Sequence, residues 1–164
     1  MSGTEPSSTA EPSSTAELER LEALVDSWAA AQAEENPSVA AVVRDHESGE
    51  RRWFVRLHGE EKDVFSVWFH LRQRNLHVET YLMPAPEDDA ERLYEHLLRR
   101  SATIAPFSCC IGEEDAIYLT SQVPNRWIDE HVLDELLGGA YEYTERCFRP
   151  AMRIGLAGRL PPGF

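Results

Sequence analysis

Apolar and polar positions alternate along residues 63–83, and this stretch gives the clearest structural signal in the chain. The alternating apolar residues are Val67, Phe69 and Leu71 in its first half and Leu76, Val78 and Leu82 in its second half. Such alternation, rich in aromatic and β-branched residues, is typical of strands with one face in a core. Because four polar residues separate the halves, the pattern predicts a β-hairpin with a two-residue loop at Gln73 and Arg74.

The pairing register of this hairpin follows from its apolar set. We expect Leu71 to pair with Leu76 and Phe69 with Val78, because a slip of one residue would place polar side chains opposite apolar ones. The same register places His70 opposite His77, Trp68 opposite Glu79 and Ser66 opposite Tyr81. We call the sheet face that bears these last residues the second face. It mixes aromatic rings, imidazoles and a carboxylate, which is typical neither of a core nor of a plain solvated surface.

Apolar residues at a spacing of three and four predict three helices. These helices cover about residues 17–34, 87–100 and 129–148. The apolar stripe of the second helix includes Leu97 and Leu98, which we expect to be buried. Asp129 is the expected N-cap of the last helix, and Pro150 is expected to end it because proline lacks an N–H group.

Further alternation predicts the rest of a sheet. Strands are expected at residues 52–58, 107–111 and 117–123, whereas residues 39–44 form either a short edge strand or an irregular segment. The resulting order is helix, three strands, helix, two strands, helix (α-β-β-β-α-β-β-α). Short connections and segregated helices predict an α+β fold, in which an antiparallel meander of about five strands carries its helices on one face.

The length of 164 residues predicts one folded domain. Residues 1–16 contain the hexapeptide Glu-Pro-Ser-Ser-Thr-Ala twice and no core-forming residues, so we expect a disordered tail. Residues 17–156 form the expected domain, and residues 157–164 a loose C-terminal tail.

The chain carries a net charge of −13. This acidic balance argues against binding to nucleic acids or to an anionic membrane surface, and it favours a basic or neutral partner. No apolar stretch follows a basic start, and no run is long enough to span a membrane. Three cysteines give no disulfide framework, so we expect reduced thiols and a cytoplasmic location.

His70, His77 and Glu79 share the second face and could form a metal site. Imidazole and carboxylate groups suit zinc and similar ions, so a metal-dependent enzyme is the alternative function. Against it, Glu79 lies two residues after His77 on the same strand, which makes convergence on one ion awkward. The preferred interpretation is a polar cross-strand face without a metal or cofactor.

The second face is also the best candidate for partner binding. Enrichment in aromatic residues and arginine is typical of the residues that anchor protein interfaces. The predicted partner-binding residues are Arg56, Trp68, His70, His77, Glu79, Tyr81 and Tyr118. The face is a site for a protein client, a homodimer contact, or a surface that a tail covers. An exposed sheet edge is the alternative place for client capture.

Several segments carry a family resemblance. They are Arg-Trp-Phe-Val-Arg-Leu at 52–57, Gly-Glu-Glu-Lys-Asp at 59–63, Val-Trp-Phe-His-Leu-Arg-Gln-Arg at 67–74, Glu-Thr-Tyr-Leu-Met-Pro-Ala-Pro-Glu at 79–87, residues 94–100, Asp-Ala-Ile-Tyr-Leu at 115–119, Gln-Val-Pro at 122–124 and Cys-Phe-Arg-Pro-Ala-Met-Arg at 147–153. With these segments the chain resembles the YbjN family, most closely its actinobacterial branch, over residues 17–156.

The resemblance has implications for fold and function. The YbjN family shares the fold of type III secretion chaperones, has no established catalytic residues and is loosely described as sensory transduction regulators. Its fold relatives are small acidic dimers that bind an extended segment of a client protein. The resemblance therefore implies a non-enzymatic, chaperone-like or regulatory protein-binding module that homodimerises and needs no cofactor.

Overall fold

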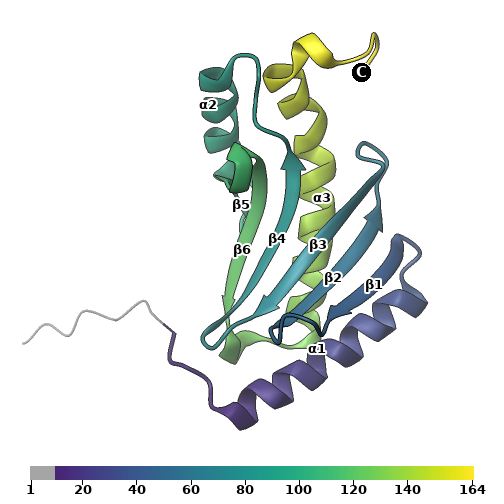
Figure 1. Ribbon diagram of the computed structural model, residues 1–164, viewed down its shortest axis with the longest axis vertical. Coiled ribbons are helices and arrows are strands. Elements are labelled where there is room, and N and C mark those ends of the chain that lie inside the picture. The colour runs from purple at the N-terminus through teal and green to yellow at the C-terminus, as the bar shows by residue number, and fades with distance from the viewer. Residues whose placement is uncertain (1–9) are drawn as a thin grey trace, which may run out of the picture.

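The computed structural model describes residues 10–164, so the disorder expected for residues 1–9 lies outside the described part. Residues 10–164 form one six-stranded antiparallel sheet with helices packed against it (Figure 1). The strands are β1 (Val39–Asp45), β2 (Arg51–His58), β3 (Val64–Leu71), β4 (Asn75–Met83), β5 (Ser108–Ile111) and β6 (Ile117–Pro124). The helices are α1 (Thr15–Glu35), α2 (Ala90–Ser101) and α3 (Glu130–Gly155), joined by the 3-10 turns η1 (Glu113–Asp115), η2 (Asn125–Trp127) and η3 (Ala157–Arg159).

The sheet order β1-β2-β3-β4-β6-β5 confirms the predicted α+β meander, with one strand more than expected. The additional strand is β1, which pairs with β2 at the sheet edge. Arg44 of β1 lies over the Trp53 ring and forms an ion pair with Glu22 of α1, so contacts with two elements hold the strand. The run Val-Ala-Ala-Val-Val has no clear period, which is why its sequence pattern was ambiguous.

The central hairpin has the predicted register. Leu71 pairs with Leu76, Phe69 with Val78, Trp68 with Glu79 and His70 with His77. The main-chain N–H of Arg72 donates to the carbonyl oxygen of Asn75 at 3.0 Å, as a two-residue loop requires. The core-facing residues of β2, β3 and β4 are buried, whereas the alternate residues are half-buried or exposed. The buried face therefore fixes the register, as the apolar pattern indicated.

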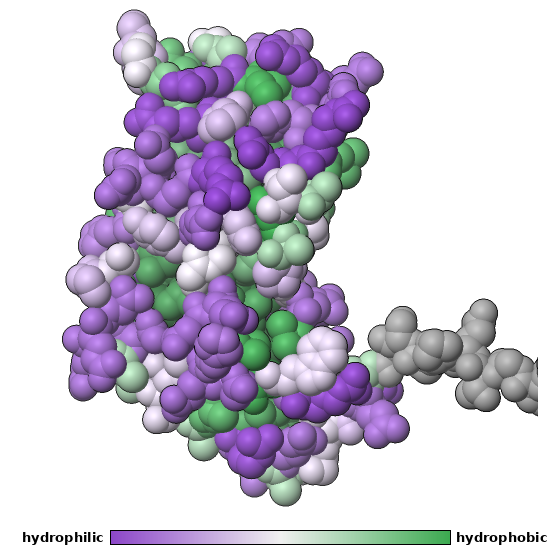
Figure 2. Space-filling view, turned by 180° about the vertical axis from the view of Figure 1, so that it is seen from behind, coloured by the Kyte–Doolittle hydropathy of each residue, from purple (hydrophilic) through white to green (hydrophobic). Residues whose placement is uncertain are grey.

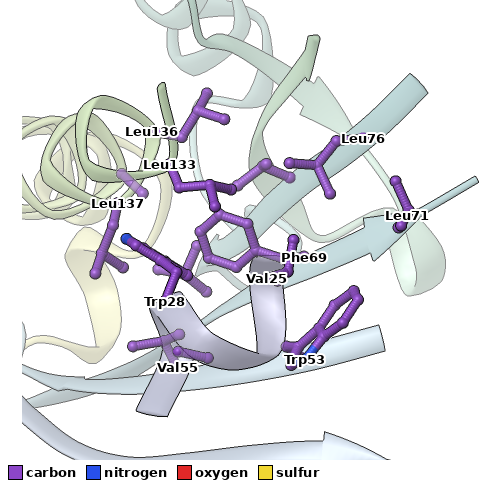
Figure 3. Packing of buried hydrophobic residues seen from close by; sticks show 14 of the residues in the cluster. Val25, Trp28, Trp53, Val55, Phe69, Leu71, Leu76, Leu133, Leu136 and Leu137 are labelled. Atoms are coloured by element: carbon purple, nitrogen blue, oxygen red, sulfur yellow. The ribbon is translucent and has the colours of Figure 1, made fainter. Parts of the chain in front are cut away.

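The main core lies between this buried face and two helices, α1 and α3 (Figure 3). The Trp28 ring of α1 packs edge-on against Phe69, with ring centroids 5.2 Å apart. Its indole N–H donates to Asp134 of α3 at 2.8 Å, so the polar atom of this buried ring is satisfied. Leu133 and Leu137 of α3 complete the contact between the helices and the sheet.

Helix α3 does not end at Pro150, and that prediction is wrong. The helix continues to Gly155, although proline cannot donate the hydrogen bond that its position would normally supply. Ala151 and Leu156 are buried in a second apolar cluster with Leu93 of α2. This packing outweighs the lost hydrogen bond and holds the last turn in place.

The described parts of both predicted tails contact the domain. Ser13 is buried, its N–H donates to the Gln73 carbonyl at 2.8 Å, and Asn125 donates to its hydroxyl at 3.0 Å. At the other end, the Phe164 ring packs against Phe148. Most residues of 10–14 and 157–164 are exposed, but Ser13 and Phe164 contact the domain. The sequence did not indicate these contacts, because single contacts to loops or helix surfaces leave no periodic signal.

Candidate functional site

The second face of the sheet is open to solvent in the described chain. In Figure 1, α3 passes behind the strands, and the alternate residues of β2, β3 and β4 that point away from the core are only partly buried. Strand register places all seven predicted partner-binding residues on this face. They are Arg56 of β2, Trp68 and His70 of β3, His77, Glu79 and Tyr81 of β4, and Tyr118 of β6.

One aromatic pair lies on β2 and β3. The rings of Phe54 and Trp68 meet edge to face with centroids 3.8 Å apart, and the Arg52 guanidinium lies 4.7 Å from the Trp68 centroid. Phe54 and Arg52 were not among the predicted site residues. Strand alternation could have found both, because they share a strand face with Arg56.

A second aromatic pair lies on β4 and β6. Tyr81 and Tyr118 pack at nearly perpendicular angles with centroids 5.6 Å apart, and Tyr81 is 40% exposed. Burial is the main cause that raises the pKa of both phenols. Both therefore keep their O–H groups at neutral pH and remain available as hydrogen-bond donors.

A polar hollow of about 210 Å³ lies beside Trp68, on the side toward the β3–β4 turn. Its lining residues are Glu50, Arg52, Trp68, His70, Arg72, His77 and Glu79. His70 lies 3.6 Å from Glu50, and His77 lies 3.6 Å from Glu79, so each imidazole faces its own carboxylate. Burial, with a smaller effect of Arg72, lowers the pKa of His70, and the His77 imidazole lowers the pKa of Glu79.

In the described chain, His70, His77 and Glu79 are not arranged as a cluster of three metal ligands. Nowhere in residues 10–164 do three or more His, Cys, Asp or Glu side chains cluster in a way that would hold a metal ion. The Nε–H of Arg72 donates to Nδ1 of His70 at 3.2 Å, while Nε2 of His70 faces Glu50. The Nδ1 atom of His70 is thus occupied by Arg72, and its Nε2 atom lies beside a carboxylate that is not part of the predicted set.

Arginine charge on the second face is only partly compensated. Within the described range, Arg56 and Arg72 form no ion pair with a carboxylate, although Arg52 lies near Glu50. Arginines on the helix side are neutralised instead, as Arg44 and Arg51 both contact Glu22. The second face therefore offers guanidinium groups without a carboxylate partner on a molecule whose net charge is −13.

A different apolar surface lies at the sheet edge formed by β5. A hollow of about 330 Å³ between α2 and β5 is lined by Tyr94, Leu97, Leu98, Cys109, Cys110, Ile111 and Ile117. Leu98 is 70% exposed, so its predicted burial is wrong, and Ile111 is 53% exposed. Elsewhere on the helix side, the surface is largely hydrophilic with small apolar patches (Figure 2). No helix in residues 10–164 combines the length and apolar character needed to cross a bilayer.

Comparisons by sequence give distant relatives without a described function. No family model matches the chain. An uncharacterized protein of Mycobacterium leprae is 25% identical over 104 residues, which cover 63% of this chain and 56% of that protein. An uncharacterized protein of Mycobacterium bovis is 25% identical over 101 residues, which cover 62% of this chain and 55% of the relative. The chain therefore spans just over half the length of these relatives.

Comparisons by structure show the fold. The HopA1–SchA chaperone–effector complex contains a chain with a TM-score of 0.56 and 15% identity, which matches over 85% of this chain and 99% of that chain. The ExsC–ExsE complex gives a TM-score of 0.55 at 16% identity, over 79% and 94%. The heterodimeric ExoU–SpcU complex from the type III secretion system of Pseudomonas aeruginosa gives 0.51 at 14%, over 77% and 98%. The predicted type III secretion chaperone-like fold is thus confirmed.

Proposed function

We propose that this protein is a non-enzymatic, chaperone-like module that captures a segment of a partner protein on the second face of its sheet. The observation that carries the proposal is an open sheet face with two edge-packed aromatic pairs, one centred on Trp68 and one on Tyr81. Partly exposed aromatic rings beside arginine are the residues that supply most binding energy in protein interfaces. The shared fold with a chaperone–effector complex and the resemblance to the YbjN family support the same function.

The charge of the second face favours a particular kind of segment. Arg56 and Arg72 are exposed and lack carboxylate partners in the described chain. A bound segment with acidic side chains would supply these partners, and its apolar or aromatic side chains would cover Trp68 and Tyr81. We therefore propose an extended segment that combines acidic and apolar residues as the ligand, in place of the basic or neutral partner that the net charge of −13 favours.

The state of the thiols supports a binding role over nucleophilic catalysis. Burial raises the pKa of Cys147 to about 11 and, as the main cause, also raises the pKa of Cys109 and Cys110. All three thiols are free and stay protonated at neutral pH, so none provides a thiolate nucleophile. We place the module in the cytoplasm, where reducing conditions keep such thiols free.

Affinity capture with matched variants tests the proposed site. The double variant Trp68→Ala/Tyr81→Ala removes one ring from each aromatic pair, and Trp127→Ala removes an exposed ring that lies outside the second face. A partner should be captured by the wild type and by Trp127→Ala but lost with the double variant. Overlapping peptides of that partner then locate the bound segment, and its Kd should rise at least about 30-fold in the double variant, as loss of about 2 kcal/mol implies.

Circular dichroism must first show that the double variant is folded. If the folded double variant captures the same partner and binds its peptides with unchanged Kd, the second face is not the binding site.

Homodimerisation is a further part of the proposal, and we assign it to the sheet edge formed by β5 and to the adjoining helix α2. Strand β5 pairs only with β6 among the described strands, and although the N–H of Cys109 donates to the Ser101 hydroxyl of α2 at 2.9 Å, its remaining outer main-chain groups are available for pairing. Two identical edge strands can pair antiparallel about a two-fold axis. The exposed Leu98 and Ile111 of each copy would then be covered by the other copy.

A further inference from the structure

Arg72 and His70 are joined by a hydrogen bond that only a neutral imidazole can accept. The Nε–H of Arg72, in the turn after β3, donates to Nδ1 of His70 at 3.2 Å. That Nδ1 atom therefore carries a lone pair, and the ring proton lies on Nε2, which faces the Glu50 carboxylate at 3.6 Å. A second proton on the ring would sit on Nδ1 and place two N–H donors against each other. Protonation of His70 therefore breaks this contact and leaves the Nε–H of Arg72 without its acceptor.

Both side chains line the polar hollow of about 210 Å³ on the second face. The charged and titratable groups that line it with His70 come from the end of the β1–β2 loop, from β2, from the β3–β4 turn and from β4. They are Glu50, Arg52, Arg72, His77 and Glu79. Two guanidinium groups balance two carboxylates while both imidazoles are neutral, and each imidazole that takes a proton adds one positive charge. The hollow therefore becomes positively charged as the pH falls through the range in which histidine titrates.

Other nitrogen atoms of the same side chains have unmet hydrogen-bonding capacity. Within residues 10–164, the Nε atom of Arg52 and the Nδ1 atom of His77 are buried without a hydrogen-bond partner. Arg52 lies opposite His70 on β2, and His77 lies opposite His70 on β4, so three neighbouring strands bring these nitrogen atoms to one place. A negatively charged oxygen in the hollow would be an acceptor for such donors, and hydrogen bonds to a charged acceptor are the strong ones.

An anion in the hollow would also help His70 to take up its proton. Burial is the main cause that lowers the pKa of His70, and the positive charge of Arg72 comes next. Arg52 and His77 act in the same direction, while Glu50 opposes them. A bound anion would offset these positive neighbours and would therefore raise the proton affinity of the imidazole.

We propose that this hollow is an oxyanion subsite, in which Arg72 and protonated His70 donate together to one carboxylate or phosphate oxygen of the bound segment. The inference rests on the proposed capture of an acidic segment by the second face, and it adds a proton, taken from solvent, to that event. Because the imidazole binds this proton more tightly when the oxyanion is present, the Kd of the segment falls as the pH decreases. Capture is thus regulated by pH between about pH 5 and about pH 7.5.

Sulfate is the probe for this coupling, because it stays a dianion throughout that pH range. Nuclear magnetic resonance follows the Cε1–H signals of the six histidines while sodium sulfate replaces sodium chloride at constant ionic strength. Loss of one signal in His70→Gln assigns the His70 ring. We expect the sulfate Kd to be at least about threefold lower at pH 5 than at pH 7.5, and the titration midpoint of His70 to move to higher pH with sulfate.

Variants separate the two donors, with the His77 signal as the readout of binding. Arg72→Gln should raise the sulfate Kd at least about fivefold at pH 5, whereas His70→Gln keeps an N–H donor and should lose most of the pH dependence. His131→Gln and Arg99→Gln are the matched controls, since both residues are exposed, face a glutamate and lie outside the hollow. Both controls should bind sulfate as the wild type does.

The proposal is wrong if sulfate leaves the titrations of His70 and His77 unchanged, or if His70→Gln keeps the pH dependence of the wild type. Acetyl-glutamate methylamide and acetyl-phosphoserine methylamide, titrated at about pH 6, distinguish the two sources of the oxyanion, and the lower Kd identifies the side chain. No partner protein is present in these titrations. A negative result here therefore overturns only the subsite, whereas unchanged capture by Trp68→Ala/Tyr81→Ala overturns the proposed function.

Discussion

Gly59 shows how closely single residues control the β2–β3 loop, in which the main-chain N–H groups of Glu60 and Glu61 donate to the Glu145 carboxylate of α3 at 2.8 and 2.6 Å. A methyl group at Gly59 would overlap the Glu145 carboxylate and the carbonyl oxygen of Lys62. Since part of this obstacle is main chain, the loop would have to move away from α3. We expect Gly59→Ala to lower the free energy of unfolding by about 1–3 kcal/mol, the usual cost of overpacking, as measured by urea denaturation.

Gly138 provides the matched control for this substitution. It is exposed within α3, and a methyl group there meets no atom within 4 Å. Gly138→Ala should therefore stabilise the protein by about 0.5–1 kcal/mol, because alanine favours helix more than glycine does. Equal effects of the two substitutions would show that contact with Glu145 does not constrain Gly59.

At the same scale, the sequence predicted some contacts and could not predict others. The pairs His70–His77 and Trp68–Glu79 were predictable, because burial of the alternate residues penalises any other register. The bonds from the β2–β3 loop to Glu145 were not predictable. They join residues more than 80 positions apart, and acidic residues at a loop and on a helix surface carry no pattern that relates them.

At the scale of elements, the end of α3 and the turn after it hold the start of α2. The main-chain N–H groups of Glu87 and Asp88 donate to the carbonyl oxygen of Gly155 at 2.8 and 2.9 Å, and the N–H of Gly158 donates to the Asp88 side chain at 3.0 Å. Pro150 was expected to end α3, because proline is unfavourable inside a helix. The contacts of α3 with α2 decide otherwise, and they are invisible in a local pattern.

Truncation tests this arrangement. Removal of residues 150–164 takes the buried Ala151 and Leu156 out of the second apolar cluster, so we expect the free energy of unfolding to fall by at least about 2–5 kcal/mol. Hydrogen exchange should become faster in α2 in particular. Removal of only residues 161–164 loses the contact of Phe164 with Phe148 and should cost about 1 kcal/mol or less.

The single substitution Leu156→Ala covers the case in which the longer truncation does not fold. It should cost about 2–4 kcal/mol and accelerate exchange in α2. If Leu156→Ala and the shorter truncation both leave exchange in α2 unchanged, the C-terminal segment does not support that helix.

At the scale of the whole molecule, the fold was more predictable than its surfaces. Alternation and helical spacing report which side of each element is buried, and this was sufficient for the α+β architecture and the second face. Leu98 illustrates the limit of such reasoning. Its spacing fits the apolar stripe of α2, but the sheet ends at β5 and leaves this residue without a neighbour to cover it. Where a sheet ends depends on strand order, which local pattern does not give.

The exposed edge at β5 leads to a prediction about the assembly. We expect the wild type to have the mass of two chains in light scattering at micromolar concentration, and Leu98→Asp to have the mass of one, because the charge would be buried at the proposed two-fold interface.

Val43→Asp is the control, since Val43 is 50% exposed on β1 at the opposite edge of the sheet. That variant should remain dimeric, as should Trp68→Ala/Tyr81→Ala. A monomeric wild type, or a dimeric Leu98→Asp, would contradict the β5 interface. A dimer lost only in the Trp68→Ala/Tyr81→Ala variant would instead assign self-association to the second face.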